Sequence, residues 1–179
     1  MNLFRAFFAV AAAGVLSLSA ADLSKITDVK RWSPFECTAA QAGKGLTVNM
    51  PVDHKGGQKD YLVGWPRAYL YKMTQAEKDW SKAKALTFQF KLEFTGTTAR
   101  QRIYFQVRTR GPQATTKETV HSLLIPAVKN NANVTVTLPL DKVKNLNNVV
   151  TLGINIAEKD YKHGENVKVT ISDLKLINK

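Results

Sequence analysis

Hydrophobic and polar residues alternate along most of the chain with a period of two. The clearest run places Leu86, Phe88, Phe90, Leu92 and Phe94 on one parity, with polar residues between them. Strict alternation is typical of β-strands that bury one face and leave the other open. Similar runs predict about nine strands, over residues 27–35, 45–51, 62–71, 85–94, 102–108, 119–125, 134–140, 149–156 and 167–177.

One short segment carries a helical signal instead. Thr74 and Glu77 have the spacing of a capping box, in which the two residues satisfy each other's free backbone N–H groups at the start of a helix. This predicts a single short helix near residues 74–83, docked onto the strands by Trp80. Clusters of turn residues separate the strands, which favours antiparallel connections. We therefore predict an all-β fold, a two-sheet antiparallel sandwich of jelly-roll type, as one domain over residues 22–179.

The first 21 residues have the pattern of a signal peptide. An apolar run follows Arg5 and is shorter than the ~20 residues that a membrane-spanning helix requires. Ser19-Ala20-Ala21 then places small side chains where signal peptidase reads the chain, so we expect cleavage after Ala21. The mature chain, without a transmembrane segment, is expected to be secreted or periplasmic.

The charge of the chain indicates what kind of partner it meets, and its cysteine content decides whether a disulfide can form. Lys and Arg number 26 against 14 Asp and Glu, a formal net charge of +12. An exported protein this basic meets polyanions such as acidic glycans, and export separates it from nucleic acid. The alternative is that the lysines only keep the protein soluble. Cys37 is the single cysteine, so no intramolecular disulfide can form.

No catalytic pattern is present in the sequence. His54, His121 and His163 stand alone, without the spacing of a helical zinc site, and no nucleophile elbow or paired-cysteine motif occurs. The acidic residues are scattered, so no pair is singled out for glycoside hydrolysis. The sequence favours a binding module over an enzyme and indicates no catalytic residues.

Two predicted strands carry rings beside guanidinium groups. Trp65, Arg67 and Tyr69 share one parity of the first strand, and Tyr104 and Arg108 share one parity of the second. Sugar rings stack on aromatic faces, and Arg donates paired hydrogen bonds to hydroxyls or carboxylates. These five residues are the predicted ligand contacts. The alternative is that Trp65 and Tyr69 fill the core and the arginines are solvated.

Three segments together resemble a known superfamily: Gly64-Trp65-Pro66, Asp79-Trp80-Ser81, and the final run from Val169 to Leu176, whose parity slips at Asp173 as in a β-bulge. The chain resembles the galactose-binding-domain-like jelly rolls, which include carbohydrate-binding modules and the domain of the complex I intermediate-associated protein family. The resemblance implies a jelly roll that binds carbohydrate. Some such modules hold a structural calcium ion between an acid near the first strand and an Asp in the last, and Glu36 and Asp173 occupy the matching positions.

These observations predict a secreted, non-catalytic carbohydrate-binding module that prefers acidic glycans. No cofactor is indicated apart from calcium. Two alternative functions are also compatible with the sequence. One is a small basic jelly-roll polysaccharide lyase, which would use Tyr, His and Arg on one sheet, although the characteristic motifs of such enzymes are missing. The other is an envelope adhesion or assembly protein that binds another protein through an aromatic sheet face.

Overall fold

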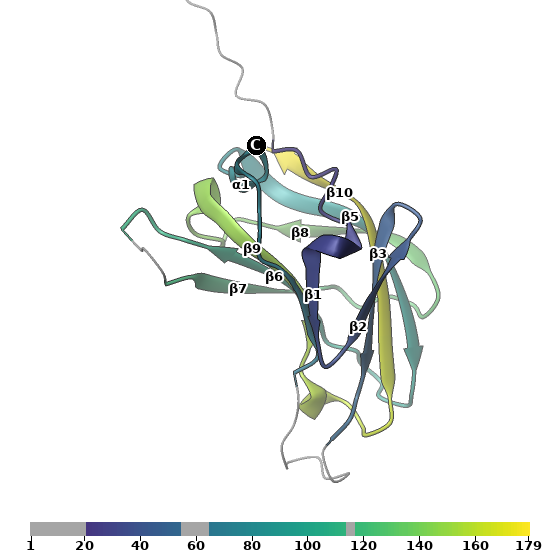
Figure 1. Ribbon diagram of the computed structural model, residues 1–179. Helices are drawn as coiled ribbons and strands as arrows, with labels where there is room; N and C mark the ends of the chain where they lie inside the picture. The colour runs from purple at the N-terminus through teal and green to yellow at the C-terminus, as the bar shows by residue number, and fades with distance from the viewer. Residues whose placement is uncertain (1–20, 55–64, 114–116) are drawn as a thin grey trace, which may run out of the picture.

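Two antiparallel five-stranded sheets pack face to face in the computed structural model (Figure 1), which describes residues 21–54, 65–113 and 117–179. The first sheet has the order β1 (Trp32–Phe35), β4 (Arg67–Leu70), β9 (Val149–Ile156), β6 (Ile103–Thr109) and β7 (Thr119–Leu124). The second has the order β2 (Thr38–Ala42), β3 (Gly45–Pro51), β10 (Asn166–Asn178), β5 (Ala83–Thr95) and β8 (Asn133–Pro139). The predicted all-β sandwich is confirmed.

The core lies between the sheets and is built from the apolar parity of each strand. Phe88 and Phe90 of β5 are buried, and Gln89 between them faces outward. Phe88 stacks on Phe105 of β6, with ring centroids 5.4 Å apart, and so joins the two sheets. Burial of each such side chain stabilises the fold by about 1.5–3 kcal/mol, which is why the alternating pattern selects this architecture.

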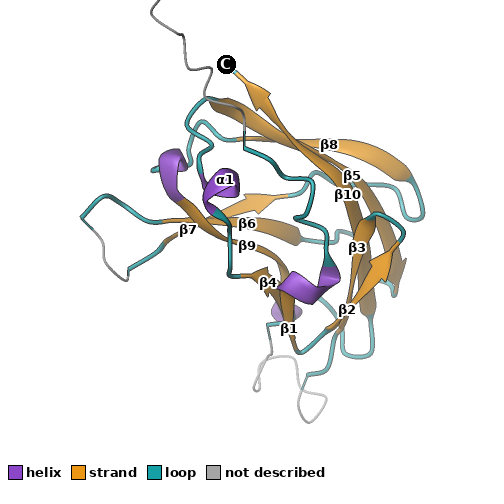
Figure 2. Ribbon diagram, turned by 45° about the horizontal axis from the view of Figure 1, so that its top comes forward, coloured by secondary structure: helices purple, strands orange, loops and turns teal. Residues whose placement is uncertain are grey.

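The helical content is small, as Figure 2 shows. Helix α1 (Gln75–Lys78) begins with the predicted capping box, and the Thr74 N–H donates to the Glu77 carboxylate at 2.6 Å. Trp80 is buried behind it, and its indole N–H donates to the Glu77 carbonyl. The capping box and the packing of Trp80 are as predicted, whereas the helix ends at Lys78, earlier than the predicted limit near residue 83. Single 3₁₀ turns occur at η1 (Val29–Arg31), η3 (Leu146–Asn148) and η4 (Glu158–Asp160). No helix in the described ranges is long and apolar enough to cross a membrane.

The structure differs from the predicted elements at the beginning of the chain. Strand β2 was not predicted because Thr38–Ala42 is largely exposed and has no apolar alternation, yet it pairs with β3 along its whole length. Strand β1 starts only at Trp32, because Asp28 caps the turn η1 where a strand was expected. Residues 1–20 of the predicted signal peptide (residues 1–21) and residues 62–64 of the predicted strand 62–71 lie outside the described residues.

The predicted bulge in the last strand is confirmed. The pairing of β10 with β5 shifts register between Ser172 and Lys175. Asp173 sits within the shift and has a positive φ of 52°. Ile171 and Leu174 have opposite parity, yet both are buried in the core. The shift allows this, because an extra residue in one strand of a pair reverses the parity that follows it.

Candidate functional site

The exposed large hydrophobic residues of the described chain all belong to the β1–β4–β9–β6–β7 sheet. They are Phe35 on β1, Trp65 and Tyr71 on either side of β4, and Val120 and Leu124 on β7, and each is 39–49% exposed. Their strand parity places them on the outer face of the sheet, away from the core. We call this surface the aromatic face. Exposed apolar side chains that gather in one place mark an interaction surface.

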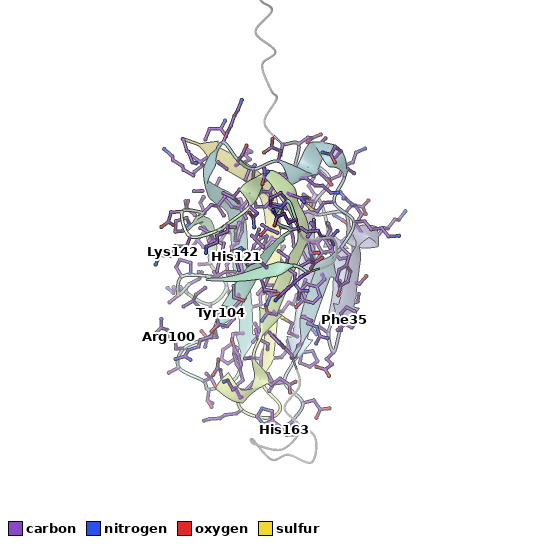
Figure 3. All side chains as sticks on the ribbon, turned by 90° about the vertical axis from the view of Figure 1, so that its left-hand side faces the viewer. Phe35, Arg100, Tyr104, His121, Lys142 and His163 are labelled. Carbon is purple, nitrogen blue, oxygen red and sulfur yellow. The ribbon has the colours of Figure 1, made fainter. Side chains whose placement is uncertain are left out.

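Strand register places polar and aromatic side chains in rows across this face. One row runs Phe35, Arg67, Asn155, Tyr104, Leu124, and the next runs Ser33, Tyr69, Gly153, Gln106, Ser122. Phe35 and Tyr104 are labelled in Figure 3. Four of the five predicted ligand contacts, Trp65, Arg67, Tyr104 and Arg108, are therefore brought together with part of each side chain open to solvent.

Tyr69 differs from the other four predicted ligand contacts in its exposure. Its side chain lies on the aromatic face, but only 3% of the residue is exposed. The Arg108 guanidinium covers the ring at 4.3 Å from its centroid, and Phe35 and Tyr71 flank it. The Tyr69 hydroxyl donates to Oε1 of Gln106 at 3.0 Å. With Arg108 over its ring and two further rings beside it, Tyr69 offers little free surface to a ligand, and the predicted contact at Tyr69 stays a prediction.

The β1–β2 turn holds Trp65 in place. Glu36 adopts a left-handed backbone conformation with φ 51°, and its Oε2 accepts the Trp65 backbone N–H at 2.7 Å. The Trp65 carbonyl in turn accepts from Nη1 of Arg67. Cys37 donates its thiol hydrogen to the Arg67 carbonyl, and burial raises the pKa of that thiol. Cys37 is therefore an anchor for the start of β4 and not an activated nucleophile.

The aromatic face carries ion pairs and one cation, Arg67, that has no carboxylate partner among the described residues. Glu118 lies between Arg108 and Arg110, at 3.7 and 3.5 Å. Arg67 contacts the rings of Phe35 and Tyr69, at 4.9 and 5.9 Å from their centroids, and no carboxylate of the described residues forms an ion pair with it. A cation held by rings and open to solvent can bind a hydroxyl or an anionic group.

A hollow of about 340 Å³ opens at one side of the aromatic face. We call it the Asn155 pocket, and it is lined by Trp65, Arg102, Tyr104, Ser122, Asn155, Ala157, Lys159 and Asp160. Only 2% of Asn155 is exposed, and its Oδ1 has no hydrogen-bond partner among the described residues. Arg102 and Asp160 form an exposed ion pair at 3.8 Å.

Asn155 was not predicted as a site residue. In the predicted strand 149–156 most of the apolar residues share one parity, and Thr151, Gly153 and Asn155 occupy the other. A glycine and an amide on the polar parity of an otherwise hydrophobic strand were the signal that could have identified it, because glycine in a strand often marks a site that something else approaches closely.

The predicted calcium pair does not come together. Glu36 precedes β2, whereas Asp173 lies beside the turn that follows it, lining a separate hollow with Lys44. The five residues of β2 span roughly 16 Å. Within the described ranges, no three His, Cys, Asp or Glu residues cluster in a way that could hold a metal ion. Glu36 instead binds the Trp65 backbone.

The three histidines are not on the aromatic face. His121 pairs with Val107 and shares its parity, which points to the side opposite Arg108, and burial lowers its pKa. His54 and His163 lie near each other, with ring centroids 6.1 Å apart, at an end of the sandwich that Figure 3 shows away from Tyr104. The combination of Tyr, His and Arg that a lyase would need on one sheet face is therefore not assembled.

Comparison with known proteins gives matches only among solved structures; no family profile and no curated protein matches the chain. The family 11 carbohydrate-binding module from Clostridium thermocellum, in complex with a β-1,3-1,4-mixed-linked tetrasaccharide, is similar, with 14% identity, a TM-score of 0.51, and coverage of 83% of this chain and 89% of that one. A family 30 carbohydrate-binding module gives 12% identity and a TM-score of 0.52 over 83% and 91% of the two chains.

An agarase is similar over 88% of this chain, with 12% identity and a TM-score of 0.54, but this chain spans only 25% of that enzyme. Identities this low establish the architecture and not the activity. The chain has the jelly-roll β-sandwich fold that these carbohydrate-binding modules share, as the resemblance in its sequence predicts.

Proposed function

We propose that this protein is a non-catalytic carbohydrate-binding module whose ligand lies across the aromatic face. The observation that carries the proposal is the gathering of every exposed large hydrophobic side chain of the described residues on one sheet face, beside Arg67 and Arg108. Sugar rings present apolar C–H faces to aromatic rings and hydroxyl groups to guanidinium donors. A neighbour in fold is described in complex with a tetrasaccharide, which agrees with this use of the architecture.

We further propose a preference for acidic glycans. The chain carries a net charge of +12, and Arg67 faces solvent on the aromatic face with no carboxylate partner among the described residues. Lys159 and Arg102 stand beside the Asn155 pocket. A surface with an excess of cations attracts a polyanion and orients its carboxylates or sulfates, and the attraction weakens as salt screens it.

The test is a glycan array with the purified protein, followed by calorimetry on a neutral and an acidic polysaccharide. Mixed-linkage β-glucan and polygalacturonate are suitable probes. We expect binding to at least one glycan class and tighter binding to acidic members of that class. The variant Gln89→Ala, on the outer face of the opposite sheet, is the matched control. Failure to retain any glycan would overturn the proposal.

A second candidate function is recognition of a protein partner. Val120 and Leu124 are aliphatic, exposed, and located on β7, which is the edge strand of its sheet. Aliphatic side chains on an edge suit a protein surface better than a sugar ring. Replacing Val120 and Leu124 by Ser should weaken glycan binding less than Trp65→Ala does if the aromatic rings make the main sugar contacts. Loss of glycan binding in that variant would shift the ligand toward the β7 edge.

We also propose that the protein is exported and that its mature form begins at Asp22. The apolar run after Arg5 and the small residues Ser19-Ala20-Ala21 support this. Export would bring a glycan-binding surface to extracellular or periplasmic polysaccharide. N-terminal sequencing of the exported protein checks the cleavage site, and a start several residues away from Asp22 would contradict it.

A further inference from the structure

The Asn155 pocket contains a buried acceptor that no described residue satisfies. Asn155 is 2% exposed, its side chain lines the hollow, and its Oδ1 has no partner among the described residues. We propose that the pocket is the seat of a single sugar residue, one hydroxyl group of which donates a hydrogen bond to Asn155 Oδ1. This inference rests on the proposed carbohydrate binding and specifies where one residue of the glycan is recognised, and by which atom.

The fold does not require an amide at this position. In register, Asn155 lies between Arg67 of β4 and Tyr104 of β6. Arg67 donates to the Trp65 carbonyl instead of to Asn155. A buried polar atom without a partner lowers stability, because it loses its hydrogen bonds to water and gains none. Such atoms are rare in folded proteins, and a binding site is one reason that they persist.

The other groups around the hollow suit a hydroxylated ring. Half of Trp65 is exposed, which leaves its ring available at the rim, and Tyr104 lies on the neighbouring strand. Ser122 and Asp160 offer oxygen atoms to hydroxyl donors, and Lys159 offers an ammonium group to hydroxyl acceptors. Ligand pockets of proteins range from about 300 to 1,000 Å³. A hollow near the lower limit of that range fits one sugar ring and not a run of several rings.

The chemistry of the proposed contact separates it from charge recognition. An amide oxygen is a neutral acceptor, so it recognises a hydroxyl on a neutral sugar and on an acidic sugar alike. Loss of Asn155 Oδ1 should therefore weaken the binding of neutral and acidic glycans by a similar factor. Loss of a cation on the same face should weaken the binding of acidic glycans more. The two kinds of residue can be told apart by the ratio of these effects.

The first experiment follows the side-chain amide signals of Asn155 by NMR in the unmodified protein. D-glucose, D-galactose and D-galacturonate are added separately as single-residue probes, and the Asn155 signals are assigned with an Asn155→Asp variant. We expect at least one of the sugars to shift these signals in a saturable manner, with those of the control residue Asn133, on β8 of the opposite sheet, unmoved. Absence of a shift with all three sugars would overturn the proposal.

The second experiment uses variants and the glycan that binds best on the array. Asn155→Ala should weaken binding by about five- to tenfold, the effect of one neutral hydrogen bond. Asn155→Asp keeps an acceptor and should bind neutral glycans within about twofold of the unmodified protein. The melting temperature of Asn155→Ala should not fall, because the variant removes an unsatisfied atom. Unchanged glycan binding by Asn155→Ala would refute the pocket while leaving the proposed function intact, whereas an array with no bound glycan would refute the function first.

Discussion

The ring of Tyr69 lies directly over Gly153, so that a Cβ atom on residue 153 would overlap two carbons of the ring. The two residues are paired across β4 and β9. Glycine at position 153 leaves room for the ring, and Arg108 packs on the same ring. The order of contacts is therefore Gly153, Tyr69, Arg108, from the sheet outward. Gly153, which has no side chain, therefore allows the Tyr69 ring to lie close to the sheet.

Gly153→Ala should destabilise the protein and disturb this stack. The added methyl group would push the Tyr69 ring away from the sheet, and overpacking of this kind costs about 1–3 kcal/mol. Thermal or urea unfolding measures the loss. Gly111→Ala is the matched control, since a Cβ atom there would meet only the Asn145 side chain at an ordinary distance of 3.5 Å. Equal stability of the two variants would contradict the proposed role of Gly153.

Trp65→Ala should separate binding from folding. Trp65 is 49% exposed, so its removal should change the melting temperature little and weaken glycan binding by about 1–3 kcal/mol, as for an aromatic anchor. Trp80→Ala is the contrasting variant. Trp80 is 1% exposed behind α1, and its truncation should destabilise the fold by about 3–5 kcal/mol. Unfolding of Trp65→Ala would assign Trp65 to the core.

Arg108→Ala and Glu118→Gln should affect acidic glycans in opposite directions. The carboxylate of Glu118 lies 3.7 Å from Arg108 and 3.5 Å from Arg110, so it partly neutralises both cations. Glu118→Gln should strengthen binding to polygalacturonate, and Arg108→Ala should weaken it, each by about 1 kcal/mol at low salt. Both effects should shrink as ionic strength rises. Effects that are the same at all salt concentrations would show that these charges do not face the glycan.

Glu165 should make stability depend on acid pH. Burial alone raises the pKa of this carboxyl, but hydrogen bonds donated by Thr98, Lys162 and Thr97 outweigh it and bring the pKa down to about 2. A pKa that is lower in the folded state than in the unfolded state stabilises the fold above the unfolded value of 4.5. That contribution is lost as the pH falls from about 4.5 toward 2.

Glu165→Gln should therefore lower stability at pH 7 by about 1–3 kcal/mol, the cost of losing charge-assisted hydrogen bonds. It should also flatten the fall in melting temperature between pH 5 and pH 2. Asp141→Asn, at an exposed position, is the control. An acid profile of Glu165→Gln that matches the profile of the unmodified protein would contradict this prediction.

The sequence predicts most of the strands because burial imposes a period of two. Leu86, Phe88 and Phe90 identify β5 and its inward parity, and the Thr74–Glu77 pattern identifies α1. Strand β2 has no such pattern and was not predicted. Thr38–Ala42 buries almost no side chain, so backbone pairing with β3 forms it without an apolar pattern to reveal it.

The candidate site, like the strands, could be predicted only in part from the sequence. Parity alone indicates that Trp65, Arg67, Tyr104 and Arg108 avoid the core, and the structure places them on one face. Parity could not show that Tyr69 is covered by Arg108, because that depends on β4 and β6 lying on the two sides of β9. The strand order within a sheet is decided by long-range pairing, which a local pattern does not contain.

The sequence by itself thus determined the fold class, the inward and outward sides of each strand, and the residue types available for binding. Only the tertiary structure decided which outward residues are neighbours. Trp65 and Asn155 line one pocket although 90 positions separate them in the chain, whereas Glu36, directly after β1, and Asp173, within β10, remain apart. The physical reason is that hydrophobic burial fixes the orientation of a side chain locally, whereas backbone hydrogen bonds between distant strands fix its neighbours.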